Sequence, residues 1–175
     1  MSEVPEKTVT RSFRINESAF LALEEEARKR NISLNTLVNQ LFLSFADFDR
    51  YFQKFGMLKI SNVAYRRTLK AVPDQEVVQA AREVAQNSAR VVLLTRYGTL
   101  SLGGVLEYLK CLADYGYWFE YNEVLSPERK RVITLTHSLG EKFSVFMIAY
   151  SKSLFEQIAM NPKLASTEDS ITITI

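Results

Sequence analysis

The chain has 175 residues, with 22 Lys and Arg against 20 Asp and Glu, and its net charge of +2 is small for a nucleic-acid binder. Hydrophobic residues make up 47% of it, which suits one medium domain or a small module joined to a larger one. No run of eighteen apolar residues and no apolar signal segment occurs, so we expect a cytoplasmic protein without a membrane partner. The only cysteine, Cys111, excludes a disulfide framework and is expected to be a buried small hydrophobe.

The first predicted element is a short strand, T-V-T-R-S-F-R-I-N, at Thr8 to Asn16. With a side-chain period of two, one face carries Val9, Phe13 and Ile15, and the other carries Thr10, Ser12 and Arg14. A lone strand before a helical unit has no partner in its own segment, and its unpaired backbone groups are costly. The pattern therefore predicts a homodimer in which two copies pair their strands.

Such a two-stranded ribbon has a polar face that is doubled by symmetry and fits the major groove of DNA. Arg14 is the expected reader of guanine edges, because a guanidinium can donate two hydrogen bonds to guanine.

Two amphipathic helices are predicted next. Asn16 is the expected N-cap of the first helix, on which Phe20, Leu23 and Ala27 form an apolar stripe. Ser33 is the expected cap of the second helix, which we expect to end near Gly56. Its apolar residues recur at three-and-four spacing: Leu34, Leu37, Val38, Leu41, Phe42, Phe45, Phe48, Phe52 and Phe55. We expect the part from Ala46 to Phe55 either to extend the dimer contact or to dock the following domain.

The segment F-R-I-N-E-S-A-F-L-A-L-E-E-E-A-R-K-R-N-I-S-L-N-T-L-V resembles the ribbon-helix-helix fold of Arc/MetJ-type repressors. The resemblance covers residues 8–45, about a quarter of the chain, and rests on residue types rather than invariant letters. It implies that Thr10, Ser12 and Arg14 contact bases, and that the backbone from Ser33 through Leu34 to Asn35 holds a phosphate. Asn31 stands where this family commonly has Gly, and Asn tolerates the left-handed conformation better than most residues.

The small net charge must be concentrated on the ribbon and the second-helix N-terminus, because Glu24 to Glu26 make the first helix acidic. We expect Arg11 to contact phosphates together with the helix start at Ser33. Tetramers on tandem sites would compensate for a low affinity per dimer through avidity.

The sequence after Gly56 predicts a second domain at residues 57–175. Helices are expected around V-A-Y-R-R-T-L-K-A-V, from Gln75 to Ala89 with Asp74 as cap, and from Leu102 or Gly103 to Tyr115. The run A-R-V-V-L-L-T-R-Y-G fits either a strand or a short buried helix.

A hairpin is expected next, with Y-W-F-E-Y-N-E-V-L and K-R-V-I-T-L-T-H-S joined at Pro127. A helix after Gly140 and the alternating tail S-I-T-I-T-I, which can pair with a sheet edge, complete the pattern. The fold class predicted for the whole chain is therefore α+β: a ribbon-helix-helix module (residues 1–56), then a mixed helical domain with a small antiparallel sheet.

Residue types needed for catalysis or metal binding are scarce. One His and one Cys cannot supply a Cys/His metal site, and Y-G-T-L-S-L-G-G is neither a phosphate-binding loop nor a dinucleotide motif. We expect no metal, no cofactor and no enzyme activity.

His137 shares a strand face with Ile133 and Leu135, which favours a hydrogen-bonded structural histidine. The alternative is a sensing residue that responds to pH or binds a ligand beside Tyr117, Trp118 and Tyr121.

These features together predict a homodimeric, repressor-like transcriptional regulator that binds specific sites in double-stranded DNA, with a C-terminal domain for oligomerisation or sensing. The alternative is an antitoxin whose C-terminal region binds a toxin. Residues 57 to 165 look able to form their own core, whereas toxin-binding regions are often short and disordered alone.

Overall fold

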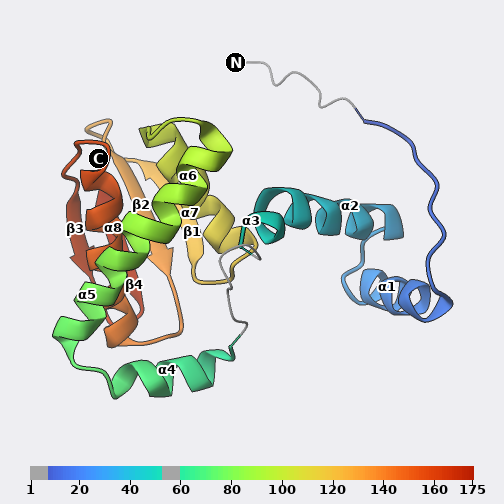
Figure 1. Ribbon diagram of the computed structural model, residues 1–175, viewed down its shortest axis with the longest axis horizontal. Helices are drawn as coiled ribbons and strands as arrows, with labels where there is room; N and C mark the ends of the chain where they lie inside the picture. The colour runs from blue at the N-terminus through green and yellow to red at the C-terminus, as the bar shows by residue number, and fades with distance from the viewer. Residues whose placement is uncertain (1–7, 53–59) are drawn as a thin grey trace. The chain divides into compact units, whose positions relative to one another are not determined.

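The computed structural model describes residues 8–52 and 60–175, and the chain divides into two compact units, Met1–Phe45 and Ala46–Ile175 (Figure 1). The domain boundary expected at Gly56 lies outside the described residues. The class is α+β, with a small antiparallel sheet in the C-terminal unit.

The N-terminal unit is a pair of helices, α1 (Glu17–Lys29) and α2 (Leu34–Ser44). Asn31 has a φ of 53°, and two hydrogen bonds close the turn: Asn31 N–H to the Arg28 carbonyl (3.1 Å) and Ile32 N–H to the Ala27 carbonyl (3.0 Å). This pair of bonds is the Schellman motif, in which a left-handed residue ends a helix. The left-handed conformation expected at Asn31 is confirmed. Asn16 occupies the N-cap position of α1 but its side chain makes no capping hydrogen bond.

The strand expected at Thr8 to Asn16 is not formed in the single chain. Residues 8–16 belong to neither a helix nor a strand, and every strand of the described chain lies in the C-terminal unit. A strand is defined by its hydrogen-bonded neighbour, and residues 8–52 contain no second extended segment that could serve as one.

The helical run of α2 continues through a π-helical turn, η1 (Phe45–Asp49), into α3 (Arg50–Phe52). Phe48 is buried in the core of the C-terminal unit, where its ring lies 6.2 Å from that of Tyr115. Of the two alternatives expected for this extension, docking on the following domain is confirmed for Phe48 and Tyr51, which pack in its core, whereas a dimer contact stays a prediction. Residues 53–55 lie outside the described residues.

From residue 60 onward, the first elements of the C-terminal unit are helices. These are α4 (Asn62–Lys70), α5 (Asp74–Val84), the π-helical turn η3 (Ala85–Ala89), α6 (Arg90–Tyr97) and α7 (Leu102–Asp114). The ambiguous run at Arg90 to Tyr97 is a helix that continues α5 through η3, with Val92 and Leu93 buried. Asp74 is not the cap of α5: Pro73 takes that position, and Asp74 is the first helical residue. A carboxylate in the first turn is still favourable there because of the helix dipole.

The predicted hairpin is confirmed as β1 (Glu120–Leu125) and β2 (Arg131–Thr136). Pro127 follows Ser126, whose carbonyl accepts a 2.9 Å hydrogen bond from Arg129 N–H, and Arg129 has a φ of 59°. This is a turn followed by a left-handed residue, a common geometry for a three-residue hairpin loop.

The sheet is completed by β3 (Lys163–Ser166) and β4 (Ser170–Thr174), which follow α8 (Glu141–Glu156). Within residues 60–175 the strand order is β1-β2-β4-β3, and all neighbours are antiparallel. The tail S-I-T-I-T-I therefore pairs with β2, as expected of an alternating run, and also with β3, a strand that the sequence analysis did not predict.

Helices cover one face of this sheet (Figure 1). Ile133, Leu135, Ile171 and Ile173 are fully buried, while the alternate residues are threonines such as Thr134 and Thr172. Helix α7 packs on β1, and α8 packs on β3 and β4. Helix α5 packs on α8. The turn η3 also packs on α8, and the stripe shared by α5 and η3 consists of small side chains. Val77, Ala81, Ala85 and Ala89 recur every fourth residue and are all buried.

Substitution of Gly116 tests how closely the chain packs between Leu112 and Phe48. A Cβ added there would lie 2.7 Å from the Leu112 carbonyl oxygen and 3.1 Å from Phe48 Cζ. We expect Gly116→Ala to lower the free energy of unfolding by about 1–3 kcal/mol, because the obstructing atom is backbone. Gly103→Ala is the control: a Cβ there has nothing within 4 Å, so a gain of up to about 1 kcal/mol is expected. Urea denaturation measures both, and equal effects of the two substitutions would contradict the packing argument.

Candidate nucleic-acid interface

The segment before α1 exposes both of its faces. Thr10, Ser12 and Arg14 are exposed, as is Arg11, and so are the alternate residues Val9, Phe13 and Ile15. Apolar side chains on alternate positions are typical of a strand that has one covered face. The chain itself provides one contact, since the Phe13 ring packs edge-on against Phe42 of α2 with a centroid separation of 6.0 Å.

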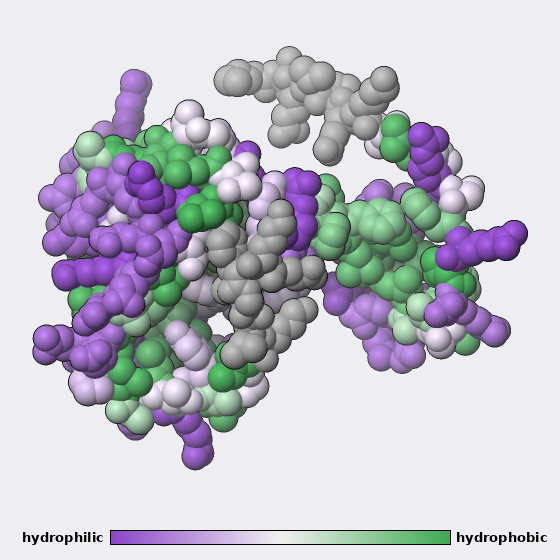
Figure 2. Space-filling model, viewed as in Figure 1, coloured by the Kyte–Doolittle hydropathy of each residue, from purple (hydrophilic) through white to green (hydrophobic). Residues whose placement is uncertain are grey.

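The apolar stripe of α2 is also uncovered. Leu41, Phe42 and Phe45 are 48%, 53% and 54% exposed, and Figure 2 shows hydrophobic residues gathered on the surface of the N-terminal unit. Among the described residues of this unit, only Ala27 and Leu37 are buried hydrophobics. An apolar stripe that is left uncovered in this way is typical of a surface that binds a partner.

The start of α2 presents backbone donors. Ser33 caps the helix as expected, because its Oγ accepts a 3.0 Å hydrogen bond from Thr36 N–H and lies 2.7 Å from Thr36 Oγ1. The N–H groups of Leu34 and Asn35, the next two residues, donate to no acceptor within residues 8–52. Free N–H groups and the helix dipole make this end suitable for an anion such as a phosphate.

Two glutamates of α1 form ion pairs near the end of the helix. Lys29 Nζ lies 2.7 Å from Glu25 Oε1, and Arg30 Nε lies 2.6 Å from Glu26 Oε1. Arg11 and Arg14 form no ion pair within residues 8–52, so their charges are free to meet an external anion. The acidic run in α1 is thereby neutralised in part by its own helix, which the sequence analysis did not anticipate.

His137 is a buried, fully hydrogen-bonded residue at the end of β2. Its Nε2 lies 3.0 Å from Ser144 Oγ, its Nδ1 accepts a 3.3 Å bond from Leu139 N–H, and burial lowers its pKa although Asp169 raises it. Both ring nitrogens are occupied, which fits the structural role. Of the aromatic residues expected beside it, Tyr117 is exposed and Tyr121 donates to Glu123 at 2.7 Å.

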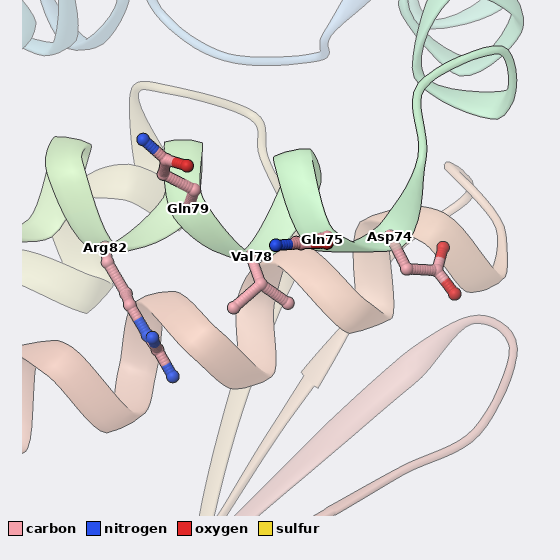
Figure 3. Close-up of a pocket in the computed structure, with 5 residues that line it drawn as sticks. All are labelled: Asp74, Gln75, Val78, Gln79 and Arg82. Atoms are coloured by element: carbon pink, nitrogen blue, oxygen red, sulfur yellow. The ribbon is translucent and has the colours of Figure 1, made fainter.

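Two hollows lie in the described part of the C-terminal unit. One runs along α5 and is lined by residues of that helix alone: Asp74, Gln75, Val78, Gln79 and Arg82 (Figure 3). Asp74 there is already paired with Lys142. Another lies where the hairpin loop meets the threonine face of the sheet, and includes Lys130, Lys163 and Thr174. Neither hollow includes His137.

The described part of the chain contains no group of three or more His, Cys, Asp or Glu residues placed to hold a metal ion. Within that same part, none of the helices has both the length and the apolar character needed to cross a bilayer.

A cluster around Arg96 was missed by the sequence analysis. Arg96 Nη1 donates to the Cys111 sulfur at 3.0 Å and to the Asp47 carbonyl, and Arg96 Nη2 lies 3.0 Å from Asp47 Oδ1. Burial raises the pKa of the Cys111 thiol, and Cys111 is buried as expected. No local pattern links residues 47, 96 and 111, so this cluster could not be read from the sequence. It fixes the π-helical turn η1 to the C-terminal unit.

Comparisons of the chain with protein-family models, with curated proteins and with solved structures give no match.

Proposed function

We propose that the protein is a site-specific, DNA-binding transcriptional regulator that acts as a homodimer through an N-terminal ribbon-helix-helix module. The observation that carries the proposal is the N-terminal unit itself: an exposed alternating segment is followed by two helices whose apolar face is uncovered. A second copy would cover that face and pair the two segments as an antiparallel ribbon.

In this dimer the ribbon lies in the major groove with its polar face toward the bases. Arg14 donates two hydrogen bonds to a guanine, while Ser12 and Thr10 contact neighbouring bases. Arg11 and the free N–H groups of Leu34 and Asn35 at the start of α2 bind phosphates, which sets the position of the ribbon. The charges of Arg11 and Arg14, unpaired within residues 8–52, support these roles.

The C-terminal unit supports a regulator rather than an antitoxin. It has an extensive core of its own, formed by α5, α7, α8 and the sheet. A toxin-binding region that folds only on its partner would lack such a core. We assign this unit to oligomerisation or sensing, with tetramers on tandem sites as the larger assembly.

Arg14→Ala provides the test. Binding sites are selected from random duplex DNA with the full-length protein, and affinities are measured at about 50 mM and about 200 mM salt. We expect wild-type affinity to fall steeply with salt, and Arg14→Ala to lose about 1–3 kcal/mol of discrimination at one base in each half-site. Adding Ser12→Ala should relax a neighbouring position.

Lys152→Ala is the matched control, because it removes one positive charge from an exposed position on α8. We expect it to leave base preference unchanged. If the wild type selects no sequence, or if the Arg14→Ala, Ser12→Ala double variant selects the same sequence with the same affinity, the ribbon mechanism is wrong.

A further inference from the structure

The turn from His137 to Gly140 follows β2 and is called the His137 corner below. It is stabilised by His137, the only histidine in the chain. His137 N–H donates a 2.8 Å hydrogen bond to the Asp169 carbonyl, and its ring reaches Ser144 in the first turn of α8. Ser144 Oγ in turn lies 3.1 Å from the Glu168 carbonyl oxygen. The ring therefore connects three segments: the end of β2, the start of α8 and the turn between β3 and β4.

The donor and the acceptor of each hydrogen bond at this corner can be assigned in only one way. Leu139 N–H points at Nδ1 of His137, so Nδ1 carries a lone pair and Nε2 carries the proton. The Nε2 proton then goes to Ser144 Oγ, and the Ser144 hydroxyl donates to the carbonyl of Glu168. All three bonds are satisfied together only when the imidazole is neutral. The same direction leaves Nε2 unable to accept a proton from Ser144.

A second proton would break this arrangement. It would add an N–H at Nδ1 that faces the Leu139 N–H, leaving two donors opposed in a buried site. The ring also lies beside the first turn of α8, where the helix dipole disfavours a cation. The Phe143 ring lies 4.8 Å away and perpendicular to the imidazole, which is itself buried.

The charged groups around the corner only partly oppose this effect. Asp169 favours the protonated form, whereas burial disfavours it more strongly, so the pKa of His137 is lowered. The Glu168 carboxylate lies 3.5 Å from Arg66, which itself lies against Gly140. On α8, Lys142 is bound to the Val72 carbonyl and to Asp74, and Glu141 is exposed.

We propose that the His137 corner is an acid-sensitive latch of the C-terminal domain: proton uptake at Nδ1 opens the Leu139 turn and separates the first turn of α8 from the β3–β4 turn. The latch controls the docking of α4, because Tyr65 packs on Phe143 with a ring separation of 6.0 Å and Arg66 pairs with Glu168. The proposal is independent of DNA binding.

The sign of the pH dependence follows from the neutral native form. The unfolded chain binds a proton near the ordinary pKa of 6.5, and the native chain binds it only at lower pH. The stability contributed by the corner is therefore complete above 6.5 and decreases as pH falls toward the lower native pKa.

NMR of the full-length protein between about pH 7.5 and about pH 5 tests the latch. We expect imidazole ¹⁵N shifts of the Nε2–H tautomer at neutral pH and a titration midpoint below 6.5. The Leu139 amide and the fluorescence of Trp118, whose ring lies 6.3 Å from that of Phe143, should change with the same midpoint. The Ile133 amide in the sheet should not.

Two variants separate the latch from general acid unfolding. His137→Gln does not titrate, so the change at Leu139 and Trp118 should disappear. Ser144→Ala keeps the imidazole but removes its acceptor, so the change should persist with a shifted midpoint. An Nδ1–H tautomer at neutral pH, a midpoint at or above 6.5, or a Trp118 change retained in His137→Gln would overturn the proposal.

Discussion

Leu41→Asp is expected to leave the chain monomeric and to reduce DNA binding at least a hundredfold. Leu41 lies on the uncovered stripe of α2 and is 48% exposed in the single chain, so the substitution does not damage the fold of one copy. In the proposed dimer the same position is covered by the second copy. An unpaired carboxylate buried there costs about 3–5 kcal/mol, more than enough to separate the copies at micromolar concentration.

Leu43→Asp is the matched control. Leu43 has nearly the same exposure, 44%, but is two residues further along α2 and hence about 200° around the helix axis. It should leave both the dimer and DNA binding intact. Analytical ultracentrifugation gives the assembly state of each variant, and the selected DNA site gives its affinity. A monomeric wild type, or equal effects of the two substitutions, would refute the proposed dimer face.

Phe143→Ala is expected to cause the largest loss of stability in the C-terminal unit, about 3–5 kcal/mol. Phe143 is 2% exposed, and its ring contacts those of Tyr65, Trp118, His137 and Phe146. Truncation removes this shared contact and leaves a cavity between α4, α8 and the end of β2. Much of the lost free energy comes from that cavity, because the three elements are fixed by other contacts.

Tyr117→Ala is the control for this loss. It removes an aromatic ring of similar size from the same unit, but the ring is 78% exposed, so a change within about 0.5 kcal/mol is expected. Chemical denaturation followed by far-ultraviolet circular dichroism measures both variants without depending on Trp118. A loss below about 1.5 kcal/mol for Phe143→Ala would show that this ring is not central to the core.

Elements with local sequence signals could be predicted. Asn31 ends α1 because its backbone tolerates a positive φ, and Ser33 begins α2 because its hydroxyl accepts a backbone N–H. The hairpin around Pro127 has a comparable local cause. In each case the determining interaction lies within five residues, so it is visible in the sequence.

Elements that depend on distant contacts could not be predicted. The four residues of β3 have little strand character, and they form a strand because β4 offers its free edge. The run at Arg90 to Tyr97 is rich in branched residues, yet it is helical because η3 carries the helix of α5 forward and buries Val92 and Leu93. Local propensity was overridden by packing in both cases.

In the candidate site, too, features with a local sequence signal could be predicted and features that depend on distant contacts could not. Alternation at Thr10, Ser12 and Arg14 is a sequence property, and their exposure fits it. The ribbon itself stays a prediction, because the strand needs a neighbour from a second chain. The tie of Arg96 to Asp47 depends on residues 49 positions apart and has no local signal.

The central place of β4 in the sheet has a consequence for synthesis. Its neighbours β2 and β3 do not pair with each other. Both pair with β4, so the four-stranded sheet cannot form before Ser170–Thr174 has been synthesised. During synthesis β2 is therefore complete before β4, and its inner edge stays unpaired until Ser170–Thr174 has been made. An unpaired strand edge can pair with another chain, so we expect this edge to promote aggregation when translation stops before β4.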